Sequence, residues 1–96
     1  MSVALQGRAR LSDRVVFRQF GDGVVLLDLD TGRYFGLNET AGLMVETLAE
    51  TGDVLATAEQ IAATTEQPLH RVAGDLAELC AQLADRDLII LEGTAA

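Results

Sequence analysis

The single histidine and the single cysteine are the side chains most suited to catalysis, and their spacing keeps them apart. His70 and Cys80 lie ten residues apart in a stretch with helical periodicity, which places them about 15 Å apart along a helix axis and on different faces. A nucleophile and its base must lie within hydrogen-bond reach of each other. The two serines, Ser2 and Ser12, fall in the N-terminal segment. We therefore predict no catalytic residues, with His70 on the surface and Cys80 in the core.

Three carboxylates imitate the spacing of a calcium-binding loop. Asp28, Asp30 and Glu39 occupy positions one, three and twelve of such a loop, but position six, which must be glycine, is Arg33. The run Gly21-Asp22-Gly23 lacks the third glycine and the following helix of a dinucleotide-binding loop. One cysteine excludes an internal disulfide and a multi-cysteine zinc site. The sequence therefore predicts no metal site and no cofactor.

The charge of this 96-residue chain is acidic and unevenly distributed. The net charge is −8, from 15 acidic residues against 7 arginines. Residues 1–36 hold five arginines and four acids, whereas residues 37–96 hold two arginines and eleven acids, a sum of −9. Phosphate backbones and anionic membrane surfaces repel such a chain. With no apolar run longer than four residues and no signal-peptide pattern, we expect a cytoplasmic protein with neither nucleic acid nor membrane as its partner.

The first half of the chain has the pattern of three short strands. Residues 14–20, 23–29 and 33–37 are rich in β-branched, aromatic and leucine side chains, and glycine-containing turns separate them. A three-residue loop at 30–32 with Gly32 in the left-handed region would pair Leu27 with Phe35 and Val25 with Leu37. In that register these four side chains share the buried face, and Asp28 and Tyr34 share the other face.

The second half has the pattern of three helices. Asn38 is a suitable N-cap for a first helix that ends at Gly52. Thr57 and Gln60 form a capping box for a short second helix. Pro68 begins a third helix that ends near Asp87. One face of this helix carries an apolar stripe, formed by Leu69, Val72, Leu76, Leu79 and Leu83. Residues 88–91 then follow as a short extended tail.

The predicted fold is an α+β domain, a three-stranded antiparallel meander followed by three helices, similar to a winged helix-turn-helix. We place the domain at residues 13–92, between a flexible N-terminal tail at 1–12 and a C-terminal tail at 93–96. A winged helix usually suggests a DNA-binding regulator, but the third helix carries Arg71 beside Asp75 and Glu78, in the half of the chain with a charge of −9. The charge therefore disfavours DNA binding. Self-association through an exposed strand edge is a second alternative.

Two stretches resemble the PqqD family, whose members are also called RiPP recognition elements. The run Gly32-Arg33-Tyr34-Phe35-Gly36-Leu37-Asn38-Glu39-Thr40-Ala41 is similar to the strand-to-helix junction of that family. Asp75-Leu76-Ala77-Glu78-Leu79 and Asp87-Leu88-Ile89 are similar to its C-terminal part. The resemblance covers about residues 14–92. Many relatives carry a tryptophan where Val45 stands here, so the core is smaller at that point.

The resemblance implies a non-catalytic protein that binds the leader segment of a ribosomally made precursor peptide and presents it to a maturation enzyme. The stretch from Asp30 to Asn38 is most similar to the stand-alone members of lasso-peptide pathways, in which that enzyme is a leader peptidase. The alternative is a PqqD-type chaperone for a radical SAM maturase. In the family the leader adds as a strand beside the third strand and lies against the third helix.

An unpaired strand edge is compatible with this binding mode, because an extended peptide can use its free backbone groups. We expect the Phe35 N–H among these edge donors and the flank of the third helix as the opposite wall. The acidic helical half favours a leader with Lys or Arg. The predicted peptide-binding residues are Arg33, Tyr34, Phe35, Gly36, Leu37, Val72, Asp75, Leu76 and Leu79.

Overall fold

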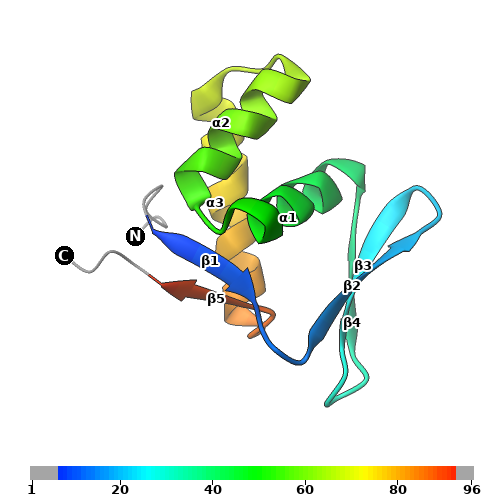
Figure 1. The fold of residues 1–96 in the computed structure, drawn as a ribbon. Coiled ribbons are helices and arrows are strands. Elements are labelled where there is room, and N and C mark those ends of the chain that lie inside the picture. Colours follow the sequence, from blue (N-terminus) through cyan, green and yellow to red (C-terminus); the bar gives the residue numbers. More distant parts are fainter. Residues whose placement is uncertain (1–6, 93–96) are drawn as a thin grey trace.

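The computed structural model describes residues 7–92, which form two antiparallel sheets and three helices (Figure 1). The predicted three-stranded meander followed by three helices is confirmed. One sheet has the strand order β2-β3-β4, and the other consists of β1 and β5. The elements in chain order are β1 (Arg8–Leu11), β2 (Val15–Phe20), β3 (Gly23–Asp28), β4 (Tyr34–Leu37), α1 (Glu39–Thr51), α2 (Val54–Thr65), α3 (Leu69–Asp85) and β5 (Ile89–Glu92).

The loop between β3 and β4 sets a register that differs by one residue from the predicted one. Asp28 Oδ1 accepts hydrogen bonds from the N–H groups of Asp30 and Thr31, and the Asp28 N–H donates to the Arg33 carbonyl over 2.8 Å. The loop therefore contains four residues instead of three. Gly32 does adopt the predicted left-handed conformation, with φ 75°.

This register changes which side chains face the core. Leu26 pairs with Phe35 and Val24 pairs with Leu37, so the predicted pairs are wrong. Because side chains alternate along a strand, Val24, Leu26 and Asp28 share the buried face, and Val25 and Leu27 lie half-buried on the other. A one-residue change in loop length is enough to exchange the two faces.

The helices begin and end at residues that satisfy their free backbone groups. The Asn38 side chain accepts from the Ala41 N–H over 2.8 Å, and Gly52 ends α1 with φ 71°, as predicted. The predicted start of α2 is wrong. Asp53 caps this helix by accepting from the Ala56 N–H, and Thr57 is buried inside the first turn.

The small sheet corrects the predicted N-terminal tail. β1 pairs with β5, with Ala9 opposite Leu91, so residues 8–11 belong to the fold and residues 88–91 are not merely a tail. A four-residue strand with two arginines has little apolar pattern of its own, and β5 supplies its partner from the other end of the chain. The remaining residues of the two predicted tails, 1–6 and 93–96, lie outside the described residues.

The core forms where α2 packs against α1 and α3, and where α3 packs against β5. Val72, Leu76 and Leu83 of the apolar stripe on α3 are buried, whereas Leu79 is half-buried and Leu69 is exposed. The β2–β3–β4 sheet extends to one side of the helices, with α1 at its base and α3 set apart from β4 (Figure 1). Of the described helices, none is long and apolar enough to cross a membrane.

Candidate functional site

The free edge of β4 presents a defined set of backbone groups. The Asp28 N–H bonds to the Arg33 carbonyl, and along an antiparallel pair such bonded positions alternate with unbonded ones. In the observed register, Arg33, Phe35 and Leu37 therefore point their backbone groups toward β3. The N–H and C=O groups of Tyr34 and Gly36 point away from the sheet. The predicted edge donor at Phe35 is wrong, because the register differs by one residue.

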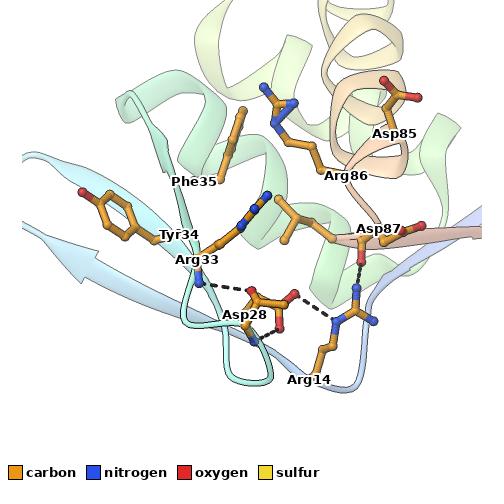
Figure 2. Close-up of a pocket in the computed structure, with 10 residues that line it drawn as sticks. Arg14, Asp28, Arg33, Tyr34, Phe35, Asp85, Arg86 and Asp87 are labelled. Carbon is orange, nitrogen blue, oxygen red and sulfur yellow. Dashed lines mark hydrogen bonds and ion pairs between the residues drawn. The ribbon is translucent and has the colours of Figure 1, made fainter.

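A cleft of about 920 Å³ lies beside β4. One wall is β4 with the loop that precedes it, and the other is the end of α3 with the turn into β5 (Figure 2). The cleft is lined by Arg14, Asp28, Thr31, Arg33, Tyr34, Phe35, Asp85, Arg86, Asp87 and Leu88.

A hydrogen-bond network joins the two walls at the floor of the cleft. Arg14 Nε donates to Asp28 Oδ2 over 3.0 Å, and Arg14 Nη2 donates to the Asp87 carbonyl over 3.0 Å. Ser12 Oγ donates to the same carbonyl over 2.6 Å. Asp87 itself lies in the left-handed region, with φ 58°. Arg14 thus connects the strand loop to the end of α3 and fixes the width of the cleft.

The Asp28 carboxyl is ionised by its surroundings. Its burial alone would raise its pKa, because the charged form loses water. The Arg14 guanidinium and the N–H groups of Asp30 and Thr31 outweigh this penalty and hold the pKa of Asp28 below its ordinary value. The same hydrogen bond to Asp28 raises the pKa of Arg14. The pair therefore stays charged throughout the neutral range.

An aromatic ring and two arginines form the upper part of the cleft. The Arg86 guanidinium lies over the half-buried Phe35 ring, 4.9 Å from its centroid. Such a cation–π contact leaves the in-plane N–H donors of the guanidinium available. Arg33 is exposed and is directed into the same space, whereas the Asp85 and Asp87 carboxylates point away from it (Figure 2).

The structure separates the predicted site residues into three groups. Arg33, Tyr34 and Phe35 line the cleft, and Gly36 lies next to them on the free edge. Leu37, Val72 and Leu76 are buried in the core, so they support the walls of the cleft without reaching it. Asp75 is exposed and Leu79 half-buried on α3, and both lie outside the cleft lining.

Sequence reasoning missed the floor and the far wall of the cleft. Arg14, Asp28, Arg86 and Asp87 come from three separate parts of the chain. The available signal was an arginine and an aspartate at the outer ends of two neighbouring strands, together with a charged run after the third helix. Neither the strand-end pair nor the charged run shows which residues it contacts until the strand register and the end of α3 are known.

Neither His70 nor Cys80 lines the cleft. Cys80 is fully buried, and burial raises the pKa of its thiol to about 11. His70 is exposed in the first turn of α3. Within residues 7–92, the structure contains no group of three or more His, Cys, Asp or Glu side chains that could hold a metal ion.

The family of the chain follows from comparison with known proteins. The model for the family described as coenzyme PQQ synthesis protein D (PqqD) matches residues 23–89, from the start of β3 to the start of β5. The chain belongs to the PqqD family. The matched region contains both walls of the cleft, and the resemblance predicted from the sequence is confirmed. No curated protein sequence matches the chain.

Two solved structures of peptide complexes are similar to this PqqD-family chain. TbiB1 in complex with the TbiA(beta) leader peptide has 34% sequence identity and a TM-score of 0.76, covering 91% of this chain and 99% of that one. Lasso peptide synthetase B1 complexed with the leader peptide has 28% identity and a TM-score of 0.75, covering 86% of this chain and 98% of that one.

Proposed function

We propose that this PqqD-family protein is a non-catalytic recognition protein for a lasso-peptide precursor. It binds the leader segment of the precursor and presents it to a maturation enzyme, a leader peptidase. Because the precursor is made on ribosomes, we place this step in the cytoplasm. The observation that carries the proposal is the open edge of β4 beside the cleft, in a chain 34% identical over 91% of its length to a leader-peptide-binding protein.

The leader adds to the sheet as a fourth strand, antiparallel to β4. Its backbone pairs with the outward N–H and C=O groups of Tyr34 and Gly36, which gives affinity without strict sequence requirements. Alternate side chains of the leader then face α3 and contact Phe35. The exposed flank of α3, with Asp75 and Leu79, forms the continuation of the binding surface beyond the cleft. Val72 and Leu76 hold that helix in position from the core.

The charge of α3 favours peptide binding over DNA binding. Asp75 and Glu78 are exposed on this helix, and Arg71 is its one arginine, with no lysine in residues 69–85. A recognition helix with this charge repels each phosphate that it approaches. The two similar peptide complexes likewise favour a lasso-peptide precursor over the substrate of a radical SAM maturase.

Fluorescence anisotropy with two labelled leader peptides tests the proposal. One is the leader of the precursor that this protein is proposed to serve, and the other is the TbiA(beta) leader. The leader of that precursor is expected to bind this protein, and its cleavage by the leader peptidase should require this protein. The His70→Ala/Cys80→Ala variant should support the same cleavage once its folded fraction is matched. A folded protein that binds neither leader would refute the proposal.

A further inference from the structure

Two arginines in the cleft have no acidic partner among the described residues. The ion pairs of residues 7–92 involve Arg10 and Arg14. Arg33 and Arg86 take part in none of them, and no described group accepts a hydrogen bond from either side chain. Both line the same cleft, so they place positive charge there in a chain with a net charge of −8.

The two guanidiniums reach the same space from opposite walls. Arg33 precedes β4, two residues before Phe35, so the two side chains lie on one face roughly 6.6 Å apart along the strand. Arg86 comes from the end of α3 and lies over the Phe35 ring. Figure 2 shows both arginines directed toward the gap between these walls, with Asp85 and Asp87 turned away.

We propose that Arg33 and Arg86 form a carboxylate-binding site that selects an Asp or Glu side chain of the bound peptide. This inference rests on the proposed function, since it assigns a specificity to the same cleft. A guanidinium offers several N–H donors in one plane, and it binds carboxylates in a bidentate manner. The contact with Phe35 holds the Arg86 guanidinium beside β4 without using its N–H donors in a hydrogen bond.

The strand register gives the position of the acidic residue. An antiparallel peptide that pairs with Tyr34 and Gly36 places one side chain opposite Phe35 and another opposite Arg33. Because the peptide runs against β4, the residue opposite Arg33 follows the one opposite Phe35 by two positions. The selected pattern is therefore an apolar residue, any residue, and then Asp or Glu. This local preference differs from the basic leader that the overall charge favours.

Selection from a display library tests this pattern without a known leader. A library of random mRNA-displayed peptides is selected on the immobilised wild-type protein and, in parallel, on the Arg33→Gln/Arg86→Gln variant. The control is Arg71→Gln, which removes one exposed arginine roughly 22 Å along α3 from Arg86. Thermal unfolding and circular dichroism establish that each variant is folded before selection.

The wild type and Arg71→Gln are expected to enrich the apolar-x-acidic pattern, and the double variant is expected to lose it. A synthetic peptide with that pattern should bind the double variant about 5- to 30-fold more weakly. Replacing its acid with Lys should restore part of the affinity in an Arg33→Glu variant. Enriched peptides without the acidic position would overturn this inference alone. A selection that enriches no peptide at all would instead count against the proposed function.

Discussion

Gly36 allows the backbone pairing of the leader to be tested with a minimal change to the protein. Its N–H points away from β3, so Gly36→Pro removes a donor that the peptide needs and the sheet does not use. Proline is tolerated on edge strands where its missing N–H would face solvent. Gly36→Ala is the matched control, because it keeps the N–H and its added Cβ meets no atom within 4 Å.

The expected loss of affinity follows from one missing hydrogen bond. Leaving a peptide carbonyl without its donor in a partly desolvated cleft costs about 1 to 3 kcal/mol of binding free energy. This loss raises Kd about 5- to 150-fold. The free energy of unfolding should change by less than about 1 kcal/mol, since no sheet hydrogen bond is lost. Gly36→Ala should bind the peptide with an affinity within about threefold of the wild type.

Anisotropy titration with the cognate leader gives the affinities, and urea unfolding gives the stabilities. Phe35→Pro provides the opposite case, because its N–H belongs to the β3–β4 pairing and its loss should destabilise the sheet. If folded Gly36→Pro bound the leader as tightly as Gly36→Ala, the peptide would not pair with this edge, and the reasoning would be refuted.

Three further predictions concern the fold that holds the cleft. Asp28→Asn should be less stable than the wild type at neutral pH. Because the folded pKa of Asp28 is lowered, the difference in urea midpoint between the two proteins should shrink as pH falls below about 4. A constant difference down to pH 2 would contradict the Arg14–Asp28 pair. Gly42→Ala should lower the thermal midpoint, because the added Cβ would lie 2.7 Å from Val24 Cγ2. Gly74→Ala, whose Cβ would meet open space, should instead gain about 1 kcal/mol of stability. Equal gains in the two variants would disprove the close packing of α1 on β3. Cys80 should react with a thiol reagent at neutral pH only as fast as the protein unfolds, and rapid labelling of the native protein would show that the core around α3 is open.

The elements with strong local signals were predictable from the sequence. Asn38 caps the start of α1 and Gly52 ends this helix, both through contacts within a few residues. The apolar stripe of α3 repeats over about four turns. The start of α2 was wrong because Asp53 and Thr57 are both good capping residues. Only the packing of α1 on α2, which buries Thr57, decides between them.

The site was only partly predictable, for reasons of register and long-range pairing. The Asx turn at Asp28 adds one residue to the loop, and this exchanges the faces of Val24 and Val25. β1 has no apolar pattern of its own, and its partner strand lies about 80 residues away in the chain. No local signal therefore predicts this strand. Arg86 was not predicted as a site residue, because it reaches Phe35 only through the position at which α3 ends. The sequence pattern does not give that position in space.

Amide exchange at the β4 edge tests the central claim most directly. Uniformly ¹⁵N-labelled protein is observed by NMR with and without the cognate leader peptide. In the free protein the Phe35 N–H should already be protected, whereas those of Tyr34 and Gly36 should exchange freely. Saturation with the leader is expected to protect Tyr34 and Gly36 and to shift the Arg86 and Leu88 resonances. Shifts confined to β2 or α1, with Tyr34 and Gly36 still exchanging freely, would contradict the account.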